Sequence, residues 1–197
     1  MNLIVQRGKA YEYRDDAGNQ YFSVSQVRKV VLDSYTGVPS SQLEPARQRG
    51  ECLHQYFALL LGSRAQVCEK PERIDGLEGY CQAIDEWAEK NDVRPLLIEE
   101  PSVNREYGFA GTPDALVEYG PKKVVAIVDL KTGSPVPTES IQLLMYRKME
   151  SYEAAKMMMD LYVDSSGRFK EVERKPDMAG WAVALAAINI LRWRAGR

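Results

Sequence analysis

Residues 108–133 read GFAGTPDALVEYGPKKVVAIVDLKTG, and this stretch decides the fold that the sequence predicts. Two strand-like runs, 110–119 and 123–130, flank the dipeptide Gly120-Pro121, which is typical of turns. Each run carries an aspartate where an apolar residue would be expected. The stretch therefore predicts a β-hairpin with acidic groups at one end of two largely apolar strands.

The register of this hairpin follows from its turn. Pro121 fits the second position of a turn over residues 120–123, because that position requires its fixed φ. Asp114 then lies opposite Asp129, with Cβ atoms roughly 4.5 to 5.5 Å apart, and two carboxylates so close ionise together only beside a cation. Lys131 points to the same face of its strand as Asp129. These residues predict either a divalent metal site or a plain salt bridge made by Lys131.

The composition is that of an ordinary globular protein, since 45% of the 197 residues are hydrophobic and 27% are charged. The formal net charge of −2 gives no global basic field that would indicate a nucleic-acid partner. Cys52, Cys68 and Cys81 are odd in number and lack CxxC spacing, which argues against a disulfide framework and a four-cysteine metal site. Neither a signal-peptide segment nor an apolar run of about 18 residues is found, so we expect a cytoplasmic protein that does not span a membrane.

The hydrophobic pattern changes from helical to strand-like along the chain. Helices are expected after a cap at Ser23 or Ser25 and ending before Gly37, then over about 40–61, 74–91, 139–152 and 177–194. Strands are expected over 3–6, 20–24, 95–103, the two runs of the hairpin, 155–163 and 169–173. In the second of the two runs, residues 124–128 are all apolar, which favours an interior strand.

This order of elements predicts an α/β fold with a central mixed β-sheet flanked by helices on both faces. No repeat or linker divides the chain, so we expect a single domain over residues 1–197. Its parts would be an N-terminal helical region of about 23–91, a sheet of about 95–173 and a C-terminal helix of about 177–194.

His54 is the only histidine, and it lies in the second expected helix within ARQRGECLHQYFALLLG. The helical spacing of Phe57, Ala58 and Leu61 puts it on the inward-facing stripe of that helix. A core histidine is one interpretation of this position. Gly50, one turn earlier, favours the other, because a glycine lets a second backbone or a ligand come close.

Four short motifs resemble those of the PD-(D/E)XK nuclease superfamily, and in particular its RecB-type exonuclease branch. They are RGECLH at 49–54, GTPD at 111–114, DLKT at 129–132 and QLLMY at 142–146. The resemblance covers about residues 47–163 and implies a restriction-endonuclease-like core.

The resemblance implies a metal centre. His54, Asp114 and Asp129 would bind the metal together with the carbonyl oxygen of Leu130, while Lys131 would orient water or stabilise the phosphate at the reacting centre. Hard oxygen ligands suit Mg²⁺ or Mn²⁺, and one imidazole is compatible with Mn²⁺ especially. One or two such ions can generate hydroxide and neutralise a leaving alkoxide. No iron-sulfur cluster is expected, because the four cysteines it needs are missing.

Members of the branch often add a glutamate from the preceding strand. Here the choice lies between Glu99 and Glu100, of which strand alternation lets only one face the site. We favour Glu100 as a catalytic residue because it shares a face with Ile98; a surface charge is the alternative for either.

The resemblance also implies contacts to substrate. Gln142 and Tyr146, one turn apart on a helix, would brace the site or touch DNA, although Tyr146 also fits an ordinary core position. The basic residues Arg47, Arg49, Arg147 and Lys148 lie beside the motif residues in sequence, so we expect them near the phosphate backbone.

The leading hypothesis is a Mg²⁺- or Mn²⁺-dependent DNA exonuclease acting on linear ends or single strands in repair, recombination or phage DNA processing. A homo-oligomer or a recombination partner protein would be consistent with it. A non-catalytic DNA-binding or assembly module that keeps the fold is the alternative, and restriction-type cleavage is a third reading within the enzyme class.

Overall fold

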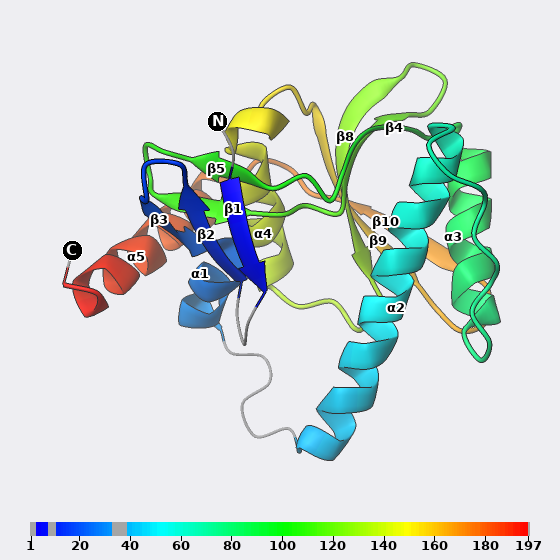
Figure 1. Cartoon of the computed structure of the whole chain (residues 1–197), viewed down its shortest axis with the longest axis horizontal. Helices are drawn as coiled ribbons and strands as arrows, with labels where there is room; N and C mark the ends of the chain where they lie inside the picture. The colour runs from blue at the N-terminus through cyan, green and yellow to red at the C-terminus, as the bar shows by residue number, and fades with distance from the viewer. Residues whose placement is uncertain (1–2, 8–10, 33–38, 197) are drawn as a thin grey trace.

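The computed structural model describes residues 3–7, 11–32 and 39–196, whose strands form two five-stranded sheets (Figure 1). The central sheet has the spatial order β10 (Phe169–Glu173), β9 (Met157–Val163), β8 (Val124–Lys131), β7 (Ala115–Tyr119) and β4 (Arg94–Ile98). Strands β8 and β9 are parallel and the other neighbours are antiparallel, so this sheet is mixed.

Helices cover both faces of the central sheet. Helices α2 (Ser40–Arg64) and α3 (Glu78–Lys90) lie on one face, where they bury Val128 and Leu130 of β8. The other face carries α1 (Val24–Val31), α4 (Thr138–Arg147) and α5 (Met178–Arg194), which share a second core with Ile127. This alternation along β8 is the period of two that a strand buried on both faces must show. The predicted α/β class is therefore confirmed.

The hairpin of β7 and β8 has the register that its turn predicts. The N–H of Lys123 donates to the carbonyl oxygen of Gly120 at 2.9 Å, and Ala115 pairs with Val128. Asp114, immediately before β7, therefore stands at the end of the ladder beside Asp129. The predicted register is confirmed.

The second sheet is smaller and was expected only in part. Its spatial order is β1 (Leu3–Arg7), β2 (Tyr11–Asp15), β3 (Gln20–Ser23), β6 (Phe109–Gly111) and β5 (Ser102–Asn104). The prediction of continuous strands over 95–103 and 110–119 is wrong, because each run divides and crosses from one sheet to the other. Pro101 and Pro113 interrupt these runs, since a proline has no N–H to donate to a strand ladder.

The helix ends differ from the predicted ones in two places. Ser23 caps α1 through a reciprocal pair of hydrogen bonds with Gln26, as one of the two predicted caps. Helix α4 begins at Thr138, one residue before the start predicted at 139. That helix ends at Arg147 and is followed by a 3-10 turn, η1 (Glu150–Tyr152), which divides the helix predicted over 139–152.

The first helix ends at Val31, before Gly37 as predicted, although Gly37 itself lies outside the described residues. Within the described ranges, no helix is both long and apolar enough to cross a membrane.

Candidate active site

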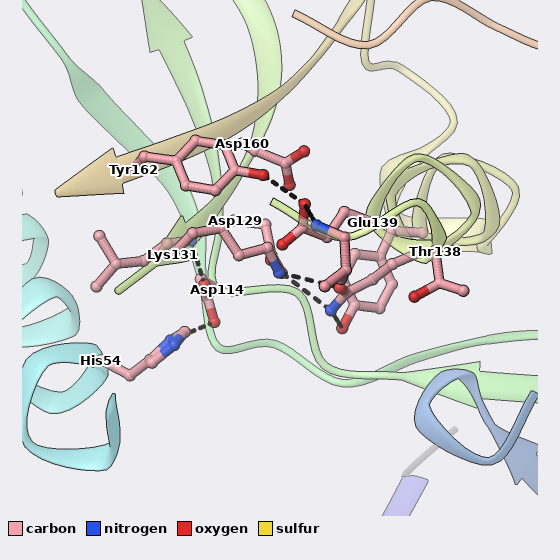
Figure 2. Close-up of polar contacts among 12 residues, drawn as sticks. His54, Asp114, Asp129, Lys131, Thr138, Glu139, Asp160 and Tyr162 are labelled. Atoms are coloured by element: carbon pink, nitrogen blue, oxygen red, sulfur yellow. Dashed lines mark hydrogen bonds and ion pairs between the residues drawn. The ribbon is translucent and has the colours of Figure 1, made fainter. Parts of the chain in front are cut away.

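Five side chains from four places in the chain meet where β7 begins and β8 ends, and Figure 2 labels four of them. They are His54 of α2, Asp114 before β7, Asp129 and Lys131 of β8, and Gln142 of α4. Segments far apart in the sequence therefore supply one polar site at the end of the central sheet.

His54 and Asp114 form an ion pair at the beginning of β7. Nδ1 of His54 lies 2.9 Å from Oδ1 of Asp114, whose Oδ2 accepts the Leu130 N–H at 2.7 Å. The charge of Asp114 raises the pKa of His54 to about 9, against the effect of burial. Burial would raise the pKa of Asp114, but the His54 charge and the Leu130 N–H outweigh it and hold that pKa below its usual value. Both groups are therefore charged at neutral pH.

Asp129 and Lys131 form a second, more deeply buried ion pair. Nζ of Lys131 contacts Oδ2 of Asp129, and the two side chains are 14% and 4% exposed. Burial raises the pKa of Asp129 to about 6, although the Lys131 charge opposes that rise. Burial would lower the pKa of Lys131, but the charge of Asp129 outweighs it and the pKa is raised. A buried ammonium is thus kept charged by its neighbour.

Gln142 connects this pair to two further helical side chains. Its Oε1 accepts from Nζ of Lys131 at 3.0 Å and from Nη1 of Arg28 at 2.6 Å. Its Nε2 donates to Oδ1 of Asp129 at 3.2 Å and to the Tyr146 hydroxyl at 2.9 Å. Both donor hydrogens and both lone pairs of the amide are used, so its orientation is fixed by its surroundings.

The two ion pairs adjoin each other but contact helices on opposite faces of the sheet. Leu130 faces α2, so alternation turns Asp129 and Lys131 toward α4, whereas His54 approaches from α2. Within the described part of the chain, no three side chains of His, Cys, Asp or Glu gather closely enough to hold a metal ion. The donor types nevertheless suit a hard divalent ion, although Oδ2 of Asp129 is already held by the Lys131 ammonium. Metal binding would therefore require the two ion pairs to open.

A cleft of about 1200 Å³ gives access to this site. His54, Asp114 and Tyr146 line it, together with residues of α2 and of the small sheet. Gly111 lies under the Tyr146 ring, where an added Cβ would be 2.8 Å from Cε1. Glycine is required there because the ring and the strand approach so closely.

The expectation that Glu100 faces the site is wrong. Glu99 lines the cleft and its N–H donates to the Asp114 carbonyl oxygen at 2.9 Å, whereas Glu100 lines a separate cavity of about 340 Å³. Strand alternation does not extend to these residues, because β4 ends at Ile98 and Glu99 has a φ of 45°.

Three of the four residues predicted near the phosphate backbone, Arg49, Arg147 and Lys148, do not line the cleft. The guanidinium carbon of Arg49 lies 5.8 Å from the ring centre of Tyr80 on α3, and Nε of Arg147 donates to the Ala155 carbonyl oxygen at 3.0 Å. Proximity to the motifs in sequence did not put them on the same side of their helices as the motif residues. Arg47 does line the cleft, but its guanidinium is already paired with two glutamates of α2.

A second buried polar cluster adjoins the site and was not predicted. Asp160 of β9 stands in register with Asp129 and accepts from Nε of Arg174 at 2.6 Å. The same guanidinium reaches Oε2 of Glu139 at 3.4 Å, and the Tyr162 hydroxyl also donates to that carboxylate. Burial raises the pKa of Asp160 despite Arg174. The cluster ties the beginning of α4 to β9.

The sequence held a signal for one part of this cluster. Asp160 interrupts the apolar strand MMMDLYV, as Asp129 interrupts β8. Arg28, by contrast, sits on an ordinary amphipathic helix, and no pattern indicated that it would reach Gln142 and Thr138.

No family model matches this chain, and no curated protein is similar to it. Among solved structures, SSO0001 is similar at 17% identity and a TM-score of 0.47, over 86% of this chain and 75% of that one. An alkaline exonuclease (LHK-Exo) from Laribacter hongkongensis is similar at 15% identity and a TM-score of 0.43, over 89% and 93% of the two chains. The same exonuclease in complex with dAMP gives 16% identity and a TM-score of 0.42 over the same shares. At these identities the similarity concerns the backbone fold alone.

Proposed function

We propose that this chain is a metal-dependent deoxyribonuclease of the PD-(D/E)XK type, related to the RecB branch, and that it acts on DNA as an exonuclease. One observation carries the proposal: the His54–Asp114 and Asp129–Lys131 pairs meet at the end of one hairpin, and the first of them opens onto a large cleft. A buried lysine and several carboxylates at one strand end suit phosphodiester hydrolysis, because that reaction needs positive charge at the phosphate.

The donor set for a metal would be His54, Asp114, Asp129 and the carbonyl oxygen of Leu130. Carboxylate and carbonyl oxygens suit Mg²⁺ or Mn²⁺. Such an ion supplies a hydroxide nucleophile near neutral pH and a Lewis acid for the phosphoryl oxygen.

The chain's own residues would hold the reacting groups in place. Lys131 keeps its proton through Asp129, and Gln142 fixes the position of its Nζ, so the ammonium is available to orient water or to stabilise a phosphate oxygen. His54 holds a proton toward Asp114, and it must release that proton before its Nδ1 can bind a metal. Tyr146 forms part of the cleft wall next to these groups.

The substrate would be DNA, entering the cleft as a linear end or as a single strand. The cellular role would be repair, recombination or phage DNA processing in the cytoplasm.

The experiment incubates the protein with linear and covalently closed circular DNA in Mg²⁺ or Mn²⁺. We expect degradation of the linear DNA alone, with loss of about two or more orders of magnitude in rate for Asp129→Ala and Lys131→Ala. Lys122→Ala, an exposed lysine in the turn of the same hairpin, is the matched control and should cleave normally. Undiminished cleavage by Lys131→Ala, or none by the wild type, contradicts the proposal. Nicking of the circle would instead favour restriction-type cleavage.

One observation favours a second candidate, a non-catalytic DNA-binding or assembly module. The four charged groups already neutralise each other in two closed pairs, as in a purely structural network. Titration calorimetry with Mn²⁺ separates the candidates, because a nuclease should release binding heat that Asp129→Asn abolishes. Asp160→Asn, the same change at the neighbouring position of β9, should leave that heat in place. A wild-type protein with no heat supports the second candidate.

A further inference from the structure

Helix α5 has an apolar face that is exposed to solvent along its whole length. Its opposite face is buried against α1 and α4. The exposed residues recur every three or four positions and form what we call the α5 stripe: Ala179, Ala182, Val183, Ala186, Ile190 and Trp193. At 100° per residue they fall within an arc of about 100°.

The largest members of the stripe are far from buried. Trp193 is 79% exposed, Val183 42% and Ile190 40%. A helix that is apolar all round is normally buried on every side, and a continuous exposed apolar face marks an interaction site. We therefore expect another surface to bind the α5 stripe.

We propose that the α5 stripe is the interface of a homodimer, in which two α5 helices pack antiparallel about a two-fold axis at Ala186. In an isologous interface, residues equally far before and after the axis face each other. Trp193 and Ala179 each lie seven residues from Ala186, so the indole of one copy covers the small side chain of the other. Ile190 and Ala182 each lie four residues away and pair likewise.

The order of small and large residues explains why the partner is a second copy. The half of the stripe before Ala186 consists of alanines and one valine, whereas the half after it carries isoleucine and tryptophan. Antiparallel packing puts each large side chain against a small one, and Ala186 on the axis lets the helices approach to about 8 Å. The stripe is thus complementary to itself.

The charges at the two ends of the helix are complementary in the same arrangement. Asp177 caps the beginning of α5, and Arg194 is its last residue. Among the described residues neither has an ion-pair partner, although both carboxylate oxygens of Asp177 accept backbone N–H groups. About the axis at Ala186, Arg194 of one copy and the partner's Asp177 come within one residue of the same level along the helix axis, and this occurs twice. Opposite charges across an interface fix its register.

The proposed interface leaves the candidate active site accessible. Figure 1 shows α5 at one edge of the molecule, on the other side of the central sheet from α2, and the residues that line the 1200 Å³ cleft include none from α5. The inference therefore does not depend on the proposed function.

The first experiment is sedimentation equilibrium of the whole chain. A 17-residue helix is about 25 Å long, so one helix pair buries less than a standard interface, and we expect a dissociation constant in the micromolar range. The wild type should approach twice the monomer mass at about 100 µM, and Ala186→Glu should stay monomeric. Ala65→Glu, the same change at an exposed position at the end of α2, is the control and should dimerise normally.

The second experiment tests the register by cross-linking. In a Cys52→Ser/Cys68→Ser background, which removes the two exposed cysteines, Ala186→Cys should form a disulfide-linked dimer on mild oxidation. Ala182→Cys should not, because its counterpart is displaced by about 12 Å along the helix axis and a disulfide needs Cα atoms within about 7 Å.

Three results would overturn the inference. The first is a wild type that stays monomeric at every concentration, and the second is a dimer that Ala186→Glu leaves intact. The third is a monomer that co-sediments with phosphatidylglycerol vesicles, because the stripe would then face a membrane surface.

Discussion

The imidazole of His54 and the carboxylate of Asp114 lie 2.9 Å apart although 60 residues separate them in the chain. This contact joins α2 to the end of the β7–β8 hairpin, so it links two parts of the molecule that no local pattern connects. It also holds a proton in the place where the site would have to accept a metal ion. The state of this proton is therefore measurable as stability and as affinity for the metal ion that we propose.

Replacing His54 with glutamine should reveal the charge of the histidine through the pH dependence of stability. Glutamine can still donate to Asp114 but carries no charge. The pKa of His54 is raised from 6.5 to about 9 in the folded state, so its stabilising charge is fully present below pH 6.5 and is lost as the pH rises through about 9. The free energy of unfolding is measured by urea titration with a chelator present. The wild type should exceed His54→Gln in this free energy most at pH 6 and least near pH 10. A difference that does not change with pH would show that folding does not shift the pKa of His54.

Replacing Gln142 with alanine should destabilise the protein by about 2 kcal/mol, because Lys131 and Arg28 lose a buried acceptor and Asp129 loses a donor. Urea denaturation gives the free energy of unfolding. The control on the same helix, Ser140→Ala, removes only one hydrogen bond to the Pro137 carbonyl oxygen and should change this free energy by less than about 1 kcal/mol. Equal effects of the two changes would mean that the network around Gln142 contributes nothing to stability.

Adding one methyl group at Gly111 should destabilise the folded protein. The Cβ of alanine would lie 2.8 Å from Cε1 of Tyr146, so we expect about 1 to 3 kcal/mol of destabilisation from overpacking. Gly133→Ala is the matched control, because nothing lies within 4 Å of its added Cβ. Combining Gly111→Ala with Tyr146→Leu should cost less than the sum of the two single changes, as a double-mutant cycle would show. If the two effects are strictly additive, the strain does not come from the contact between the added methyl group and the Tyr146 ring.

Removing the guanidinium of Arg174 should leave Asp160 buried without a counter-charge. Arg174→Met should lower the free energy of unfolding by about 3 kcal/mol at neutral pH. The pKa of Asp160 is already raised by burial and would rise further in the variant. The difference in free energy of unfolding between wild type and variant should therefore shrink as the pH falls, because the carboxyl group then protonates in the folded state. Adding Asp160→Asn to Arg174→Met should recover part of the loss at neutral pH. A deficit that grows toward acid pH would contradict this account.

The sequence predicts most where local rules act without competition. The Gly120-Pro121 turn sets the register that pairs Ala115 with Val128, and the apolar run before Asp129 identifies an interior strand. Helices on both faces of the sheet follow from the order of elements. These features depend on turn chemistry and on the period of two along a strand, both of which are visible in a single chain.

The sequence fails where a side chain's surroundings are set by distant elements. The choice of Glu100 over Glu99 assumed unbroken alternation, but a positive φ at Glu99 ends it. Arg28 gave no local sign of its contact with Gln142, because that contact depends on how α1 packs against α4. Asp160 could have been found, since a carboxylate inside an apolar strand needs a partner wherever it occurs.

Residues 99–101 and 112–114 are the two short links by which the chain passes between its sheets, and the Glu99 N–H binds the Asp114 carbonyl oxygen across them. One residue inserted between Gly111 and Asp114 would displace the carboxylate by about 3.4 Å, enough to break its contacts with both His54 and Leu130. An insertion in the exposed turn at 120–123 would lengthen a loop at a cost of a few tenths of a kcal/mol. Evolutionary change in chain length should therefore be tolerated at the tip of the hairpin and selected against at its base.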